Sequence, residues 1–299
     1  MEAFLISVLI AATPLLLAAT GELVAERSGV LNLGVEGMML IGAVAAFATA
    51  FTTGSSALAV LAGAAAGLAM AGLFAWIALF LMANQMATGL ALTIFGIGAS
   101  GLIGQGFVGE TVEPLARLSV ETTSVGRVLL SHDALVYLAV ALCGGVGLFL
   151  TRTRAGLMLR AVGDNHDAGH ALGLPVRLIR VLAVLFGGAM AGLGGAYLSL
   201  AYTPMWGEEM TAGRGWIALA LVVFATWRPG RVLLGAWFFA AVSQMQFYGQ
   251  EIGITLPSQF LAMAPYLATI IALVIISRDA LLTKTHAPAA IGRPFRAER

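Results

Sequence analysis

The sequence is poor in charge, in cysteine and in lysine. Only 10% of its 299 residues are charged, whereas 60% are hydrophobic, and the mean hydropathy is +0.94. Soluble domains are about 45 to 50% apolar, so the composition excludes a soluble protein and predicts an integral membrane protein. The single cysteine, Cys143, excludes an intrachain disulfide. The single lysine, Lys284, stands outside any GxxxxGKS or GxxxxGKT motif, so the chain does not bind ATP through a P-loop.

Histidine is also scarce. The chain has four, His132, His166, His170 and His286, and all of them fall in predicted loops or in the tail. There is no HExxH motif for a metal site. A histidine base is therefore not expected at membrane depth, where intramembrane nucleophilic chemistry would need one. We expect a chain that is not an enzyme, with no catalytic residues, no metal site and no cofactor of its own.

Long apolar runs make up most of the sequence. A helix needs about 20 apolar residues to cross about 30 Å of hydrocarbon. Nine runs approach or reach this length, at about 3–20, 29–52, 56–82, 86–108, 133–150, 181–203, 211–227, 231–249 and 260–277. We therefore expect an all-α polytopic bundle of about nine transmembrane helices, between about eight and ten, some of them broken. The seventh run is the weakest: its apolar part, Trp216 to Trp227, rises only about 18 Å, so either Thr211 to Gly215 completes it or it is a half-helix.

Glycine is abundant, with 37 residues. Gly63 with Gly67, and Gly188 with Gly192, each have the GxxxG spacing. In lipid, small residues of this kind let helix backbones approach closely, so both pairs predict sites of helix packing.

Basic residues are divided unevenly between the two sides of the predicted bundle. With nine spans, 13 of the 16 basic residues fall on one side, and only Arg117, Arg127 and Arg214 fall on the other. Cytoplasmic loops carry the excess of Lys and Arg, so the N-terminus is expected outside and the C-terminus in the cytoplasm. The expected organisation is one transmembrane domain, 1–277, with a cytoplasmic loop at 151–180. A basic cytoplasmic tail, 278–299, follows, and we expect its last dozen residues to be disordered.

Polar side chains within the apolar runs are candidates for lining a translocation path. Asn32 and Glu36 are four residues apart, which predicts that they share one helix face. A carboxylate and an amide at membrane depth are solvated by protein or by water, and so indicate transport. The other candidates lie in the fourth and eighth runs: Asn84, Gln85, Thr88, Ser243, Gln244, Gln246 and Phe247. The alternative for each amide is hydrogen bonding between helices, and for Glu36 it is pairing with Arg27 or capping the N-terminus of a broken helix.

The long cytoplasmic loop contains a short helix with clear boundary signals. Asp164 is placed to cap it, with Asp167 at the third helical position, and Gly173 and Pro175 are placed to end it. The predicted helix runs from Asn165 to Leu172, about two turns. Such a helix either docks into a groove on a partner or lies at the lipid headgroups, and its residues alone favour neither.

Three stretches of the sequence resemble one known family. They are ERSGVLNLGVEGMMLIGA; RAVGDNHDAGHALGLPV with the following GGAMAGLGGAYLSL; and GRGWIALALVVFATWRPGRVLLGAWFFA. Together they resemble the permease subunits of ATP-binding-cassette (ABC) importers, in the branch for branched-chain amino acids, simple sugars and nucleosides. The first stretch, with Asn32, Gly34, Glu36 and Gly37, is most similar to the nucleoside and simple-sugar permeases. Gly169 and His170 depart from the family pattern, which has a helix-favouring alanine and often a basic residue there.

The resemblance implies a division of labour between subunits in a bacterial cytoplasmic (inner) membrane. Two permease chains, identical or paralogous, would form the path for a small polar solute, most often a nucleoside or a simple sugar. Two cytoplasmic ATPase subunits, which hold the ATP and Mg²⁺, would dock at the short helix. An extracytoplasmic binding protein or lipoprotein would deliver the solute, and no nucleic-acid partner is expected. The contacts with the ATPase would involve Asp164, Asn165, Asp167, Ala168, Leu172 and Gly173.

Two alternatives stay open at this point. The chain could serve branched-chain amino acids in the same class of importer. In a different class, an ion-coupled secondary transporter would use Glu36, the only clear acid within the spans, to carry a proton. Broken helices and buried acids also occur in such transporters.

Overall fold

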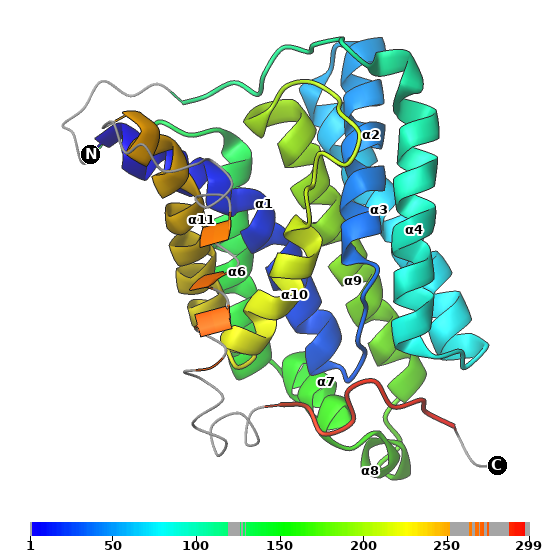
Figure 1. Cartoon of the computed structure of the whole chain (residues 1–299). Coiled ribbons are helices and arrows are strands. Elements are labelled where there is room, and N and C mark those ends of the chain that lie inside the picture. Colours follow the sequence, from blue (N-terminus) through cyan, green and yellow to red (C-terminus); the bar gives the residue numbers. More distant parts are fainter. Residues whose placement is uncertain are drawn as a thin grey trace.

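The computed structural model describes residues 2–118, 130–251 and 287–296, with isolated positions in 126–128 and 263–274. This part of the chain forms helices that pack side by side in one bundle, and it contains no β-strand (Figure 1). The long helices are α1 (Glu2–Arg27), α2 (Val35–Thr53), α3 (Ser56–Ala75) with η1 (Trp76–Phe80), α4 (Gln85–Gly104) with η2 (Gln105–Phe107), α6 (Ala134–Arg152), α9 (Val176–Tyr197) with η3 (Leu198–Tyr202), and α11 (Pro229–Glu251). Three shorter helices are α7 (Arg154–Asp164), α8 (His166–Ala171) and α10 (Arg214–Phe224).

Six of these helical stretches are long and apolar enough to cross a membrane: α1, α2, α3 with η1, α4 with η2, α6, and α9 with η3. They coincide with the first six predicted runs, although α9 begins at Val176, within the predicted loop. The seventh run forms α10, which has only 11 residues and is therefore a half-helix. The eighth run forms α11. The ninth run lies outside the described residues except for isolated positions, so the total of nine spans stays a prediction.

The chain does not pass directly from α1 into α2. Residues 28–34 are not helical, and they run from the end of α1 to the start of α2 (Figure 1). Gly29 allows the chain to leave α1, because its φ of +86° is a conformation that favours glycine. Asn32 therefore lies before α2. The prediction that Asn32 and Glu36 share one helix face is wrong. Val30, Leu31 and Leu33 look helical by hydropathy, but the chain is not helical there.

The bundle is held together most tightly where α3 crosses α9. A Cβ added to Gly67 would lie 2.2 Å from the carbonyl oxygen of Gly188, and one added to Gly192 would lie 2.2 Å from that of Gly63. The two GxxxG pairs thus face each other, and the helix backbones are in direct contact. Gly42 brings α2 equally close, since its Cβ would lie 2.5 Å from the Cα of Gly192. In lipid, such packing supplies much of the energy of helix association.

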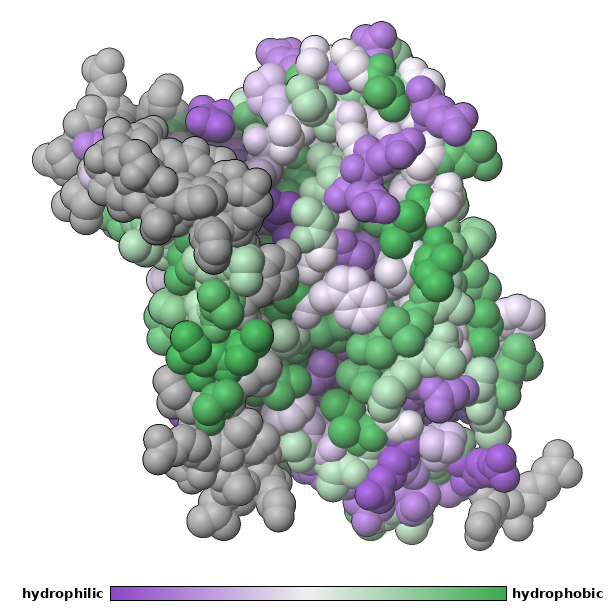
Figure 2. Space-filling view, viewed as in Figure 1, coloured by the Kyte–Doolittle hydropathy of each residue, from purple (hydrophilic) through white to green (hydrophobic). Residues whose placement is uncertain are grey.

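Burial separates the central helix from the outer ones. In α1 every residue from Ala11 to Glu26 is buried. In α4, by contrast, Ile94 is 72% exposed. Figure 2 shows hydrophilic residues gathered towards the two ends of one face, with a mostly hydrophobic band between them. This distribution is that of a membrane protein, in which apolar side chains face lipid or another apolar surface.

The described part of the tail, 287–296, folds back onto the bundle beside α7 and α8 (Figure 1). The backbone N–H of Ala290 donates to the carbonyl of Gly163 at 2.9 Å, and that of Gly292 donates to the carbonyl of Gly29 at 3.1 Å. Ala290 is buried. The predicted disorder is therefore wrong for these residues: two backbone hydrogen bonds and a buried side chain fix them to the end of α7 and to the turn after α1.

Candidate functional site

Glu36 lies at the junction of two helices. It is the second residue of α2, it is 5% exposed, and its carboxylate faces the start of α10. One carboxylate oxygen, Oε1, accepts hydrogen bonds from the Thr211 hydroxyl and from the Gly213 N–H, the latter at 2.8 Å. The other, Oε2, accepts from the Gly215 N–H at 2.6 Å. A helix N-terminus carries unpaired N–H groups and partial positive charge, so this anion stabilises the start of the half-helix.

Two glycines allow the half-helix to come this close to Glu36. Gly213 has a φ of +80° immediately before α10. A Cβ on Gly215 would lie 2.6 Å from the Cα of Glu36. The structural alternatives for Glu36 were pairing with Arg27 and capping the N-terminus of a broken helix. In the structure Glu36 caps the N-terminus of α10. Arg27 is directed elsewhere, because its Nε and Nη2 donate to the Trp227 carbonyl at 3.1 and 2.8 Å.

Asn32 is buried in the 28–34 segment, and its polar groups bond within the chain. Its side-chain Oδ1 accepts from the Gly34 N–H at 2.9 Å, and its Nδ2 lies 3.4 Å from the sulfur of Met38. Its backbone N–H donates to the Glu22 carboxylate at 3.2 Å. These contacts hold the turn that leads into α2.

Asn84, Gln85 and Thr88 lie together at the start of α4. Asn84 caps the helix, since its Oδ1 accepts from the Ala87 N–H at 3.0 Å, and the Thr88 hydroxyl donates to the Asn84 carbonyl at 2.8 Å. Gln85 reaches across to the 28–34 segment, where its Oε1 accepts from the Leu31 N–H at 3.0 Å. The Nε2 of Gln85 is buried and has no hydrogen-bond partner within the described part of the chain. Of these three side chains, Gln85 is the one whose unpaired donor is buried, since Asn84 is exposed.

The predicted group on α11 is separate from the group on α4. Ser243 and Gln244 are half-buried, and the Ser243 hydroxyl donates to the Phe239 carbonyl of its own helix at 3.0 Å. The side chains of Gln246 and Phe247 lie outside the described residues. The helix α11 packs against α1, α6 and α10, whereas α4 packs against α2 and α3. The predicted path residues whose side chains the structure describes therefore do not form a single cluster within one chain.

The predicted short helix of the 151–180 loop is α8, and its cap is one residue later than predicted. The Asn165 side chain accepts from the Ala168 N–H at 3.0 Å, so Asn165 is the N-cap. The cap at Asp164 was wrong because α7 continues through that residue. Gly173, with a φ of +81°, ends the turn after α8 as predicted. Leu172 is 81% exposed, so the helix presents an apolar side chain outward.

Arg180 is a residue that the sequence reasoning counted only as a charge. It is 1% exposed, in the first turns of α9. Its guanidinium donates to the Ser28 carbonyl at 3.2 Å, to the Arg293 carbonyl at 3.0 Å and to Nδ1 of His166 at 3.1 Å. The sequence signal for a buried arginine was its place beside an apolar run. The sequence does not show which distant groups accept its hydrogen bonds.

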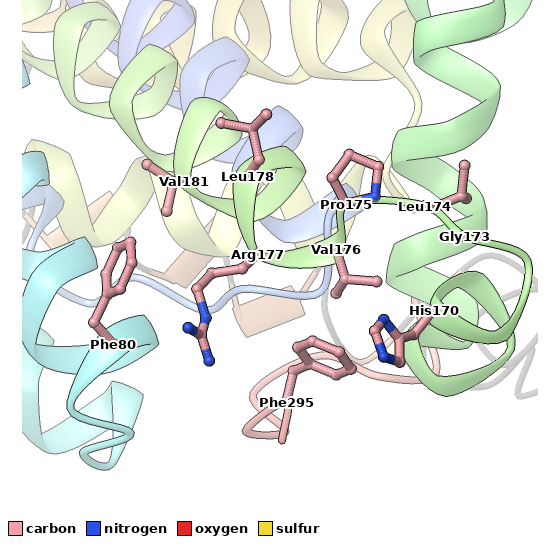
Figure 3. Close-up of a pocket in the computed structure, with 10 residues that line it drawn as sticks. All are labelled: Phe80, His170, Gly173, Leu174, Pro175, Val176, Arg177, Leu178, Val181 and Phe295. Atoms are coloured by element: carbon pink, nitrogen blue, oxygen red, sulfur yellow. The ribbon is translucent and has the colours of Figure 1, made fainter. Parts of the chain in front are cut away.

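A cavity of about 620 Å³ opens beside α8 (Figure 3). The start of α9 and residues 173–175 before it form one wall, and Phe80 of η1, His170 of α8 and Phe295 of the tail complete the lining. The Arg177 guanidinium lies over the Phe80 ring, 5.4 Å from its centroid. The Phe295 ring lies with its centroid 5.4 Å from that of His170. The tail therefore contributes a wall at the end of the bundle where α8 lies.

Known proteins similar to this chain are membrane subunits of transporters. The family model described as branched-chain amino acid transport system / permease component matches residues 4–277. The permease protein TsgC13 of Haloferax volcanii, assigned provisionally to a glucose ABC transporter, is 42% identical over 82% of this chain and 77% of its own length. The nucleoside ABC transporter permease protein NupC of Lactococcus lactis subsp. cremoris is 32% identical over 96% of this chain and 94% of its own. The guanosine ABC transporter permease protein NupQ of Bacillus subtilis is 30% identical over the same shares. The chain therefore belongs to this family of permease components, and it is a transport subunit rather than an enzyme.

Proposed function

We propose that this ABC importer permease moves a nucleoside or a simple sugar across the membrane by alternating access. The names of its relatives, which specify guanosine, nucleosides and glucose, support this class of substrate. Buried amides and hydroxyls near the start of α4 suit solutes that offer hydroxyls and ring nitrogens. Gln85, with its free amide donor, is our first candidate for contact with the solute. Asn84, Thr88, Ser243 and Gln244 follow, whereas Asn32 and Glu36 support the path by shaping its backbone.

The proposed assembly follows the family. A second permease chain, identical or paralogous, completes the path, because the predicted polar groups lie on separate flanks of this one. Two ATPase subunits bind ATP and Mg²⁺ and dock at α8, and an extracytoplasmic binding protein or lipoprotein delivers the solute. The arginines beside α8 support a cytoplasmic location for this end of the bundle. The proposal therefore has the N-terminus outside and the bacterial inner membrane as the membrane that the chain spans.

The exposed helix α8 is the observation that supports coupling to an ATPase. It has only six residues, it is capped by Asn165, and it presents Leu172 outward between α7 and α9. When ATP closes the ATPase dimer, α8 moves with it and the path opens to the other side. ATP binding can drive this change only to the extent that the complex binds ATP more tightly in one state than in the other.

Reconstitution tests the proposal. The permease is co-expressed with the ATPase, permease and binding-protein genes adjacent to its own, and the complex is placed in vesicles. We expect uptake of labelled guanosine or glucose that requires ATP, and no uptake when the ATPase carries a substituted P-loop lysine. Unlabelled leucine in excess should not compete. Competition by leucine would instead support the branched-chain amino acid alternative.

The secondary-transporter alternative predicts uptake that requires a proton gradient and no ATPase. There Glu36 would exchange a proton, but its carboxylate already accepts three hydrogen bonds at the start of α10. Protonation would weaken those bonds and with them the junction. Uptake driven by a proton gradient in vesicles that contain the permease alone would overturn our proposal.

A further inference from the structure

Arg180 joins α9 to three segments that are far apart in the sequence. Its three hydrogen bonds reach Ser28 in the 28–34 segment, Arg293 in the tail, and His166 in α8. A guanidinium is planar, and its donors have a fixed mutual geometry. A displacement of one acceptor therefore either breaks its own hydrogen bond or turns the whole group and strains the other two. As long as the three hydrogen bonds hold, movements of Ser28, Arg293 and His166 are coupled.

The tail is attached to α8 as well as to the bundle. The Phe295 ring lies with its centroid 5.4 Å from the ring centroids of both His166 and His170, at near-perpendicular angles of 76° and 68°. Edge-to-face contacts of this kind contribute beyond the burial of their area. Farther back, Ala290 and Gly292 fix the same segment to the end of α7 and to the turn after α1. The tail therefore bridges α8 and the start of the 28–34 segment.

The 28–34 segment leads directly to the helix junction. It ends at Gly34, and two residues later Glu36 binds the start of α10. Ser28 stands at the start of this segment, eight residues before Glu36, so a movement of Ser28 is passed to that carboxylate along the segment.

We propose that Arg180 and the C-terminal segment 287–296 form a strut that transmits the movement of α8 to the 28–34 segment, and so to the Glu36 junction. Arg180 and Phe295 are then positioning residues for transport. They do not contact the solute. This inference rests on the proposed function, since it assumes that an ATPase moves α8.

The test compares substrate moved per ATP hydrolysed in vesicles that contain the complete transporter. The variants are Arg180→Gln, Arg180→Lys and Phe295→Ala, each in the full-length chain. Arg177→Gln is the matched control, because Arg177 is one turn away on α9 and its guanidinium lies over Phe80 instead of bonding to the tail. The quantity of ATPase that co-purifies with each variant is measured first, so that the ratio refers to assembled complexes.

We expect Arg180→Gln and Phe295→Ala to lower the ratio of substrate to ATP by roughly threefold or more, in line with the coupling energies of contacting groups. Arg180→Lys should fall between them and the wild type, since an ammonium cannot reproduce the fork of donors. The double variant Arg180→Gln/Phe295→Ala should lose little more than either single variant, because both interrupt one strut. Arg177→Gln should keep the wild-type ratio.

An unchanged ratio in Phe295→Ala and Arg180→Gln overturns the strut, as does an equal fall in Arg177→Gln. If Arg180→Gln does not assemble, Phe295→Ala decides alone, because its ring is only half-buried. Failure of the strut is distinct from failure of the proposed function. In the first case the wild-type complex still shows ATP-dependent uptake, and in the second case it does not.

Discussion

The carboxylate of Glu36 and the backbone N–H of Gly215 are 2.6 Å apart, so an acid in the first turn of α2 binds the first turn of α10. Both helices begin at this point, and one buried anion serves both starts. A residue that looks like a transport group in the sequence thus has an architectural role. Its replacement should affect folding before it affects solute recognition.

Glu36→Gln should destabilise the protein by about 2 kcal/mol, because an amide offers one acceptor in place of two and leaves a buried N–H of α10 unpaired. We expect a lower thermal midpoint in detergent and a lower yield of folded protein. Uptake per folded molecule, measured on the same preparation, should fall much less.

Glu208→Gln is the control for that substitution, since Glu208 is an exposed acid in the loop before α10. Its thermal midpoint should equal that of the wild type. A Glu36→Gln protein with normal yield and normal thermal midpoint but no uptake would contradict the structural role and would place Glu36 in the path.

Gly67→Ala should force α3 away from α9. The new methyl would meet the Gly188 carbonyl oxygen at 2.2 Å, which only a shift of the backbone relieves. Overpacking of this kind costs about 1 to 3 kcal/mol, and we expect a fall in the thermal midpoint to match.

Gly72→Ala is the same substitution in the same helix, where the nearest neighbour of the new methyl would be 3.7 Å away. Alanine favours a helix over glycine by about 1 kcal/mol, so this variant should be as stable as the wild type or more stable. Equal destabilisation by the two substitutions would mean that the α3–α9 contact does not determine stability.

Asn165→Ala should weaken α8. The substitution removes the side-chain acceptor for the Ala168 N–H, a loss of about 1 kcal/mol of helix stability. We expect weaker binding of the purified ATPase, measured by titration against the permease in nanodiscs. Asp164→Ala, one residue earlier, removes no cap and should weaken binding less than Asn165→Ala does. The reverse order of effects would restore Asp164 as the cap.

Acid should loosen the contact between α8 and α9. Burial lowers the pKa of His166 below its ordinary value of 6.5, and the nearby Arg180 lowers that pKa further. The folded state therefore binds fewer protons than the unfolded state. The stability from this contact is complete above about pH 6.5 and is lost as pH falls through the lower folded value.

Thermal midpoints measured between about pH 7.5 and about pH 5 check this prediction. His166→Gln keeps an acceptor for Arg180 but does not titrate, so its loss of stability in acid should be smaller than that of the wild type. Parallel curves for the two proteins would show that His166 does not contribute to the pH dependence.

Much of the fold follows from the sequence because long apolar runs have few alternatives to helices in a membrane. The positions of α1, α2, α3, α4 and α6 follow from their hydropathy. The short apolar run after Gly215 left two predictions for α10, a half-helix or a full span completed by Thr211 to Gly215. The structure has the half-helix. The GxxxG spacing correctly predicted close helix packing, but the pairing of Gly67 with Gly188 needed the structure.

The errors have local causes. Val30 and Leu33 are as apolar as helical residues, so hydropathy did not show that the chain is unwound there. Asp164 and Asn165 are both good cap residues, and only the extent of α7 decides between them. The tail is rich in arginine, which favoured disorder, but its backbone pairs with Gly163 and Gly29. Distant backbone partners of this kind leave no periodic signal in a sequence.

The contact between α3 and α9 also limits how the molecule can change shape. Where two glycine-lined backbones touch, neither helix can slide or tilt without a steric collision, so α3 and α9 form one rigid frame. Gly42 brings α2 into the same frame. A pair of spin labels on the lipid-facing sides of α3 and α9 should therefore report a constant distance through the whole transport cycle. That constant distance would be the reference against which the displacement of α8 is measured.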